Sequence, residues 1–270
     1  MSPTIFLSVD LYESMDYPFE TEDREYEGRH CKHRTPVHVG AMSMQGLTLH
    51  KRVVRSCVPG EAPGRPVQSS QLWSKGANVH HAQDLLTPGE ARYLIEAADV
   101  SGSCKRSKVL KPGGSRESDV RTSTSCFLKK AGDPVIECIE RKVATYAGKD
   151  VANLEPLQVT KYAKGQQYKP HYDWFQHRKK GDAQRTATVF AYLQECGGTE
   201  CGGATVFSEL KQDGKPLRVY PKVGAAVYFD NLTPDGRGNK LTRHGGEPVL
   251  CDRRQKIGLN CWFRDKPWPR

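Results

Sequence analysis

The stretch Leu157-Gln-Val-Thr-Lys-Tyr162 begins the part of the chain that decides the fold. From this point to the C-terminus, short runs rich in β-branched and aromatic residues alternate with clusters of Gly, Pro, Asp or Asn, which is the pattern of strands separated by turns. A series of such strands is typical of a β-sandwich or barrel. The expected strands span residues 157–162, 186–193, 204–207, 225–229 and 257–263.

Two helices are expected before these strands. The first begins at Thr87-Pro-Gly-Glu90, which combines a cap residue, a proline at the first helical position and the glutamate of a capping box. The second begins at Asp133-Pro134 and ends at Gly148. Helices followed by many strands favour a mainly β fold of the α+β class, in which helices back the sheets.

The chain divides into an N-terminal extension and a folded domain. Residues 1–70 lack sustained periodicity, and they are acidic at first and then rich in Pro and Gly. Residues 71–270 carry the expected helices and most of the β-rich runs, so we predict one domain there. Within it, residues 107–125 are rich in Gly, Ser and charge, and we expect either a flexible loop or a lid that covers a substrate.

The charge of the chain is unevenly distributed. The formal net charge is +10, yet residues 1–27 hold eight acidic side chains and only one basic one, Arg24. The remaining chain is therefore strongly basic. A basic body suits an anionic substrate, a nucleic acid or a dicarboxylate cosubstrate, although a well-solvated surface explains the charge equally well.

Membrane attachment and export are not expected from the sequence. No apolar run approaches the ~18 residues that a membrane-spanning helix needs. The N-terminus lacks a basic region before its short apolar run, so we predict a cytoplasmic location. Nine cysteines include no CxxC zinc pair, and we expect most of them to be free, partly buried thiols. Cys196 and Cys201 could instead form a small disulfide.

The segment Tyr168-Lys-Pro-His-Tyr-Asp-Trp-Phe175 carries the first candidate chemistry. Side chains alternate along an extended chain, so His171 and Asp173 point the same way. His244, which lies just ahead of a further β-rich segment, is the candidate third ligand. Two histidines and one carboxylate leave open positions on a metal, as in non-haem Fe(II) oxygenases. An HxD pair alone is weak evidence, and a lone His171 is more often structural.

Several blocks of the sequence, taken in order, resemble the catalytic domain of the prolyl 4-hydroxylases. The resemblance runs from about Trp73 to the C-terminus, and so many ordered blocks are specific for this family. The blocks are Leu86-Thr-Pro-Gly-Glu90, Val120-Arg-Thr-Ser123, Glu155-Pro-Leu-Gln-Val-Thr-Lys-Tyr162, Tyr168-Lys-Pro-His-Tyr-Asp173, Arg185-Thr-Ala-Thr188, Gly202-Gly-Ala-Thr-Val-Phe207, Pro221-Lys-Val-Gly-Ala-Ala226, His244-Gly-Gly-Glu-Pro-Val249 and the segment from Lys256 to Trp262.

This resemblance implies a double-stranded β-helix, also called a jelly roll, with iron at one mouth. It also implies the reaction, in which oxidative decarboxylation of 2-oxoglutarate to succinate and CO₂ is coupled to hydroxylation of a C–H bond. Fe(II), O₂, 2-oxoglutarate and ascorbate are the implied cofactors and cosubstrates. In this family the metal ligands correspond to His171, Asp173 and His244.

A basic residue must pair with the distal carboxylate of the oxo-acid. Lys256 matches the family's lysine when the sequence is aligned backwards from Trp262. The stretch between His244 and Lys256 is longer than is usual in the family, so Arg254 competes for the same role. The alternative, that Lys256 is surface charge, is the less favoured one.

Further residues match positions near the two bound molecules. Tyr162 and Thr188 match residues that line the oxo-acid pocket, and both could equally be core residues of a strand. Tyr168, Arg185 and Trp262 match positions near the substrate. Their ordinary structural alternatives are a sheet tyrosine, a surface arginine and a buried aromatic residue.

The resemblance favours proline within a peptide or protein as the substrate. A free amino acid or a natural-product intermediate would undergo the same chemistry. The basic body and the metal ligands also permit a nucleic-acid demethylase. That alternative is less favoured, because the sequence shows no helix-turn-helix, finger or aromatic stacking motif and because such demethylases usually hold the oxo-acid with arginine, although Arg254 keeps it open. A catalytically inactive scaffold is disfavoured because all three ligand positions are filled.

Overall fold

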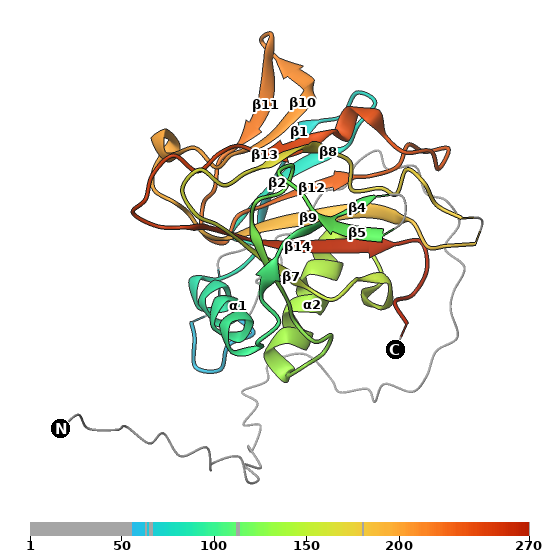
Figure 1. The fold of residues 1–270 in the computed structure, drawn as a ribbon. Coiled ribbons are helices and arrows are strands. Elements are labelled where there is room, and N and C mark those ends of the chain that lie inside the picture. The colour runs from blue at the N-terminus through green and yellow to red at the C-terminus, as the bar shows by residue number, and fades with distance from the viewer. Residues whose placement is uncertain (1–55, 63, 65–66, 112–113, 180, 270) are drawn as a thin grey trace, which may run out of the picture. The chain divides into compact units, whose positions relative to one another are not determined.

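Two antiparallel β-sheets stack face to face, and two helices cover the outer face of the larger sheet (Figure 1). The structure is a computed structural model that describes residues 56–62, 64, 67–111, 114–179 and 181–269. This arrangement confirms the predicted mainly β jelly-roll fold with flanking helices.

The larger sheet contains eight strands, and its central members are the longest. The smaller sheet contains four strands, and a separate two-stranded hairpin lies beside it. The larger sheet has the order β1 (Gln68–Trp73), β2 (Val79–Gln83), β12 (Ala226–Asp230), β9 (Arg185–Gln194), β14 (Lys256–Arg264), β7 (Gln158–Tyr162), β6 (Thr124–Phe127) and β3 (Lys105–Arg106). The smaller sheet has the order β11 (Lys215–Val219), β10 (Thr205–Gln212), β13 (His244–Gly246) and β8 (Tyr168–His171), and the hairpin pairs β4 (Lys108–Lys111) with β5 (Gly114–Glu117).

All five predicted strands are confirmed, and they correspond to β7, β9, β10, β12 and β14. Three short 3-10 helices complete the element order. They are η1 (Val151–Asn153), η2 (Thr199–Cys201) and η3 (Lys240–Thr242).

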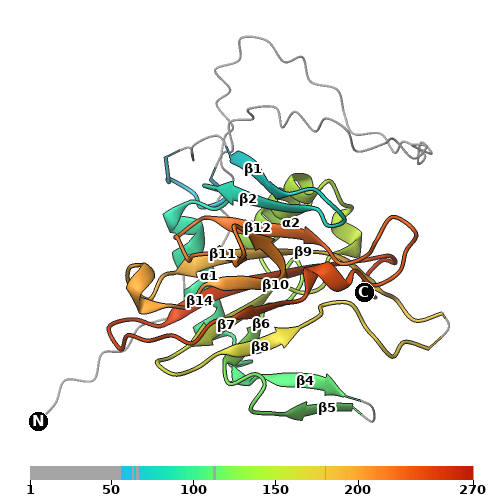
Figure 2. The ribbon, with the colours of Figure 1, turned by 90° about the horizontal axis from the view of Figure 1, so that it is seen from above.

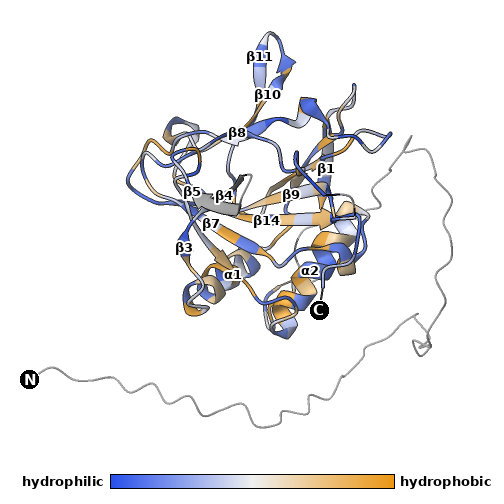
Figure 3. Cartoon of the chain, turned by 45° about the vertical axis from the view of Figure 1, so that its right-hand side comes forward, coloured by the Kyte–Doolittle hydropathy of each residue, from blue (hydrophilic) through white to orange (hydrophobic). Residues whose placement is uncertain are grey.

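Both helices begin where the sequence predicts. In α1 (Pro88–Val100), the Thr87 hydroxyl accepts a bond from the backbone N–H of Glu90 at 3.1 Å, and the Glu90 carboxylate accepts one from Thr87 at 2.8 Å, so the capping box is formed. In α2 (Pro134–Ala147), Asp133 caps the first turn and Gly148, at φ 62°, ends the helix. Both helices carry an apolar and a polar face (Figure 3).

Alternation along the central strands places one set of side chains in each of two cores. Val189 of β9 and Leu259 of β14 pack beneath the helices together with Ile139 of α2. Tyr192 of β9 points the other way, into the core between the two sheets, where it packs with Phe207. Because successive side chains point to opposite faces, the same strands support the helices and build the space between the sheets.

The predicted loop at residues 107–125 contains ordered strands. It includes the β4–β5 hairpin, which lies at the edge of the molecule next to β8 (Figure 2). The chain after the hairpin is bonded to the chain at β8, since Lys169 N donates to Val120 O at 2.8 Å and Thr122 N donates to Gln167 O at 3.1 Å. A substrate-covering role for this hairpin remains a prediction.

The expectation of mostly free thiols is wrong for the described residues. Three disulfides join segments that are far apart in the sequence, and Cys196 and Cys261 are free and buried. The suggested pair of Cys196 and Cys201 is also wrong, because Cys201 bonds elsewhere. Sequence spacing could not show these pairs, since each depends on how elements pack. The disulfides are Cys57–Cys138, Cys104–Cys126 and Cys201–Cys251.

The folded domain includes residues before position 71. Strand β1 begins at Gln68, Cys57 is bonded to α2 through Cys138, and the Glu61 carboxylate accepts a bond from Gly89 N at 2.8 Å at the start of α1. The part of the predicted extension that precedes residue 56 lies outside the described residues. No helix in the described part of the chain is long and apolar enough to cross a membrane.

Candidate functional site

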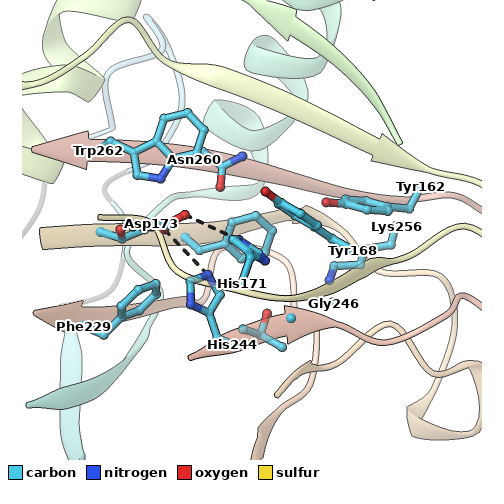
Figure 4. Close-up of a pocket in the computed structure, with 14 residues that line it drawn as sticks. Tyr162, Tyr168, His171, Asp173, Phe229, His244, Gly246, Lys256, Asn260 and Trp262 are labelled. Atoms are coloured by element: carbon cyan, nitrogen blue, oxygen red, sulfur yellow. Dashed lines mark hydrogen bonds and ion pairs between the residues drawn. The ribbon is translucent and has the colours of Figure 1, made fainter. Parts of the chain in front are cut away.

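Two histidines face each other across neighbouring strands of the smaller sheet. His171 at the end of β8 and His244 at the start of β13 are direct partners in the antiparallel pair, and their ring centroids lie 4.4 Å apart. Asp173 follows two residues after His171, and one ligand atom from each of the three residues lies within 4.8 Å of the others. The structure thus brings together the three proposed metal ligands (Figure 4).

The backbone orients both imidazoles. His171 Nδ1 lies 3.0 Å from Lys169 O, and His244 Nδ1 lies 2.9 Å from Thr242 O. A carbonyl oxygen only accepts, so each Nδ1 carries a proton and each Nε2 is left with a lone pair. The two Nε2 atoms lie 3.5 Å and 3.6 Å from the Asp173 carboxylate. A transition metal prefers such a donor set.

Electrostatics keep these groups in the form that binds a metal. Burial on its own raises the pKa of Asp173, but the neighbouring His244 and His171 and the more distant Arg185 hold it below its ordinary value. Burial, helped by the charge of His171, lowers the pKa of His244 to about 4. At neutral pH, Asp173 is therefore a carboxylate and His244 is a neutral imidazole.

Tyr168 stacks on one of the histidines. The ring centroids of Tyr168 and His171 lie 3.5 Å apart, and the two rings make an angle of 13°. The Arg121 guanidinium lies over the Tyr168 ring, 4.9 Å from its centroid. Burial raises the pKa of Tyr168 to about 12, so its hydroxyl keeps its proton at neutral pH. Tyr168 is therefore a hydrogen-bond donor on the wall of the pocket.

Lys256 lies at the other end of the pocket from Asp173 and Trp262 (Figure 4). Its side chain is 2% exposed, and it forms no hydrogen bond or salt bridge with any residue that the structure describes. Its Nζ lies 5.3 Å from the Tyr162 ring centroid. Burial lowers the pKa of Lys256 to about 8. A buried ammonium without a carboxylate partner is costly, so this end of the pocket favours an anionic ligand.

The two candidates for binding the oxo-acid lie in different environments. Lys256 is the first residue of β14 and points into the pocket, whereas Arg254 is exposed in the preceding turn. A Cβ added to Gly246 would lie 3.6 Å from Lys256 Nζ, so this glycine leaves space beside the ammonium. The structure therefore places Lys256, and not Arg254, where an oxo-acid could reach it.

Thr188 lines the pocket with Tyr162, but it lies against the metal end. Its hydroxyl donates a hydrogen bond to Asp173 Oδ2 at 2.8 Å. Its hydroxyl therefore bonds a proposed metal ligand, whereas the family resemblance associated Thr188 with the oxo-acid.

Arg185 lies behind the pocket wall and does not line the pocket. Its guanidinium stacks on the Trp262 ring at 3.7 Å and makes two bonds of 2.8 Å to Glu155. Trp262 does line the pocket, and its indole N–H is buried without a partner among the described residues. Arg185 and Glu155 therefore fix the position of an aromatic wall.

The sequence missed several polar residues around the pocket. Asn260 lines it and donates to Gln158 at 3.1 Å, and Gln158 also accepts from Arg121 at 2.8 Å. Asn260 lies between Lys256 and Trp262 in the same alternating series of β14, so this pattern could have identified it. The contacts of Gln158 and Arg121 depend on strand pairing, which no sequence signal showed.

Comparison with known proteins gives consistent matches. The sequence model of the 2OG-Fe(II) oxygenase superfamily matches residues 157–264. Prolyl 4-hydroxylase 5 of Arabidopsis thaliana is 37% identical over 209 residues, which cover 71% of this chain and 69% of that protein. The chicken (Gallus gallus) prolyl 4-hydroxylase subunit alpha-1 is 33% identical over 209 residues, which cover 74% of this chain and 38% of that longer protein.

A solved structure is also similar. The viral collagen prolyl hydroxylase of Paramecium Bursaria Chlorella virus-1, in its complex with 2-oxoglutarate, superposes with a TM-score of 0.55 at 27% sequence identity. The superposition covers 69% of this chain and 95% of the viral chain.

Proposed function

The chain belongs to the prolyl 4-hydroxylase family of 2-oxoglutarate- and Fe(II)-dependent oxygenases, and from this premise we propose that it hydroxylates proline within a peptide or protein. One observation carries the proposal. His171, Asp173 and His244 converge in a pocket whose opposite end holds the buried ammonium of Lys256, which has no carboxylate partner in the described part of the chain. Such a pocket suits a metal together with a dicarboxylate.

The donor set fits ferrous iron. His171 and His244 would bind it through Nε2, and Asp173 would bind it through a carboxylate oxygen. Two imidazoles and one carboxylate are the protein ligands of non-haem Fe(II) oxygenases, which keep open positions for cosubstrate and O₂. When bound, the iron supplies the O₂ chemistry that couples decarboxylation of 2-oxoglutarate to hydroxylation of a C–H bond, with ascorbate as the expected reductant.

Lys256 would bind the distal carboxylate of 2-oxoglutarate. The ammonium lies in a buried pocket and has no competing partner among the described residues. A charge-assisted hydrogen bond is strong in such surroundings. Tyr162 lies beside Lys256 and would form the wall against which the carbon chain of the oxo-acid packs.

Tyr168, Trp262 and Arg185 would position the substrate. Tyr168 offers a protonated hydroxyl next to His171, and Trp262 offers a flat apolar wall suited to a pyrrolidine ring. Arg185 would act by holding Trp262 in place through the stacking contact. The substrate class itself rests on the relatives, whose names describe prolyl hydroxylases.

The cytoplasmic location expected from the sequence remains a prediction, and the disulfides favour another environment. Three disulfides in one domain persist in oxidising compartments and are rare in a reducing cytosol. We infer that the domain matures under oxidising conditions. Thiol labelling of the protein taken directly from its native cells would test this inference, because six blocked cysteines are expected there.

The proposed activity is tested with purified protein, Fe(II), ascorbate and 2-oxoglutarate. Proline-rich peptides and free proline are supplied in parallel, and mass spectrometry detects the gain of one oxygen. We expect hydroxylation of the peptides with equimolar succinate, and no product with His171→Ala. Hydroxylation of free proline alone would contradict the proposed peptide substrate, and succinate without any hydroxylated product would contradict proline as the target.

A further inference from the structure

A chain of two hydrogen bonds leads from Asn231, the residue that follows β12, to Asp173. The Asn231 side-chain amide donates to Thr188 Oγ1 at 2.9 Å, and Thr188 Oγ1 donates to Asp173 Oδ2 at 2.8 Å. Asn231 is 0% exposed and Thr188 is 1% exposed, so water does not compete for either bond. Asn231 does not line the pocket, and among the described residues its side-chain hydrogen bond leads to the metal ligand through Thr188.

The amide of Asn231 decides which way the Thr188 hydroxyl points. A hydroxyl has one proton to donate and can accept at its lone pairs. Because the NH₂ group of Asn231 occupies the accepting side, the proton of Thr188 is free to point at Asp173. With the amide turned over, the oxygen of Asn231 would compete with Asp173 for that single proton, so only the observed orientation satisfies both bonds.

The backbone holds Asn231 firmly in this place. It follows β12, whose last residue Asp230 pairs with Ala187 of β9, so Asn231 lies beside the strand that carries Thr188. Its backbone N–H donates to Thr186 O at 2.9 Å, and its carbonyl accepts from Asn239 N at 2.9 Å.

The oxygen of the Asn231 amide also bears on the role of this side chain. Its Oδ1 atom is buried with no hydrogen-bond partner among the described residues. An unpaired buried carbonyl costs free energy, so a residue that bears one calls for a compensating role. The amide N–H bond to Thr188 is the only side-chain bond that Asn231 makes in the described part of the chain.

We propose that Asn231 is a positioning residue for the metal ligand Asp173. By directing the Thr188 hydroxyl onto Oδ2, it restrains rotation of the carboxylate in the orientation that faces both histidines. This inference rests on the proposed function, since it concerns binding of the metal. Groups that orient a metal ligand from behind typically change metal affinity by about 10- to 100-fold when removed.

Two alternative explanations give different expectations. If Asn231 served only the backbone turn after β12, then changes at Thr188 would leave metal binding intact. If Thr188 served only as a wall for 2-oxoglutarate, then its loss would not matter in the absence of 2-oxoglutarate. Metal binding to the protein without any oxo-acid therefore separates the proposal from both alternatives.

The experiment titrates the metal-free protein with Co(II) and follows the visible absorption of the bound ion. Thr188→Val keeps the shape of the side chain and removes the hydroxyl, and Asn231→Ala removes the amide. Asn231→Asp replaces the donor by a second acceptor, which would draw the Thr188 proton away from Asp173. We expect each of these three variants to bind Co(II) about 10- to 100-fold more weakly than the unmodified protein.

Two variants provide controls. Thr188→Ser keeps the hydroxyl and should bind Co(II) within about twofold of the unmodified protein. Asn78→Ala removes an amide that donates to the neighbouring Asp230 at 2.9 Å, away from Thr188, and should likewise leave Co(II) binding unchanged. The double variant Asn231→Ala/Thr188→Val should be no worse than Thr188→Val alone, because Asn231 acts through the hydroxyl.

The outcomes distinguish this proposal from the proposed function. If the unmodified protein and His171→Ala bind Co(II) equally, the metal site itself is wrong. If His171→Ala loses binding while Asn231→Ala and Thr188→Val bind as the unmodified protein does, or if the two losses add, the role of Asn231 is overturned and the metal site stands. Circular dichroism and thermal unfolding confirm folding, and Asn231→Asp, which keeps the size of the side chain, decides the outcome if Asn231→Ala does not fold.

Discussion

The two sheets contribute to the pocket in different ways. The smaller sheet supplies both histidines from β8 and β13, which are only four and three residues long, and each imidazole is oriented by the carbonyl two residues before it. The larger sheet supplies Lys256 and Thr188 from β14 and β9, which are nine and ten residues long. Both histidines are thus oriented by local backbone, whereas the positions of Lys256 and of the Thr188 hydroxyl that bonds Asp173 depend on the register of long central strands.

Removing a ligand from the smaller sheet should have the largest effect. His244→Ala takes away one of three metal ligands, so we expect loss of metal binding and a fall of succinate formation to background. His244 lies on the three-residue strand β13, and we expect the metal-free variant to remain folded, which circular dichroism checks. Succinate formation near the rate of the unmodified protein would show that His244 is not a metal ligand.

Removing the ammonium from the larger sheet should affect the other end of the pocket alone. Lys256→Ala loses a charge-assisted hydrogen bond, and about 1.5–3 kcal/mol corresponds to a rise of roughly 10- to 150-fold in the KM for 2-oxoglutarate. Co(II) affinity should stay unchanged, which steady-state kinetics and metal titration measure together. Arg254→Ala is the matched control, and a comparable rise of KM in that variant would reassign the role.

Raising the pH should weaken the oxo-acid end selectively. The pKa of Lys256 is lowered to about 8, so above this pH the ammonium loses its proton and 2-oxoglutarate binding should weaken by up to about tenfold per pH unit. The stability of the protein without 2-oxoglutarate changes with pH in the opposite direction. Between about 8 and the unfolded value of roughly 10.4 the unfolded chain binds more protons, so this lysine makes the free energy of unfolding rise with pH.

Calorimetric titration of 2-oxoglutarate from pH 7 to pH 9 checks this expectation. The Arg254→Ala variant should give the same profile. An affinity that does not change over this range would show that the titrating ammonium is not at the binding site.

The smallest expected effect lies behind the aromatic wall of the larger sheet. Glu155→Gln replaces the carboxylate that binds Arg185 through two bonds of 2.8 Å, so the stacking of Arg185 on Trp262 should loosen. We expect about a 3- to 10-fold rise in the KM for a peptide, in line with the loss of charge assistance. The KM for 2-oxoglutarate and the affinity for Co(II) serve as internal controls, and a change in either would contradict a role confined to the substrate.

Local patterns predicted the elements whose signals are complete within a few residues. The capping box of Thr87 and Glu90 gave the start of α1, and the runs around Val189 and Leu259 gave the central strands. The spacing of His171 and Asp173 predicted that both face one site. His244 was a candidate from its place ahead of a β-rich segment and from the family resemblance, and its position opposite His171 is a consequence of strand pairing.

Features that depend on tertiary pairing were not predictable. Cys57 and Cys138 are 81 residues apart, and only the packing of α2 brings them together. Arg254 and Lys256 have the same parity in the chain, so alternation alone could not separate them, and the start of β14 at Lys256 decides which one is buried. Asn231 gave no signal, because its contact with Thr188 requires β12 to lie beside β9.

Neighbouring positions along β9 and β14 point to opposite faces of the sheet, so substitutions at them should have different consequences. Odd-numbered positions such as Val189 and Leu259 hold the layer under the helices, so changes there should reduce the amount of soluble protein in cells. The even-numbered residues Thr188 and Asn260 face the pocket, so changes at these two positions should leave abundance nearly normal and abolish turnover. In a saturation scan that measures abundance and product separately, substitutions at positions 189 and 259 should therefore lower abundance, and substitutions at the neighbouring positions 188 and 260 should lower product alone.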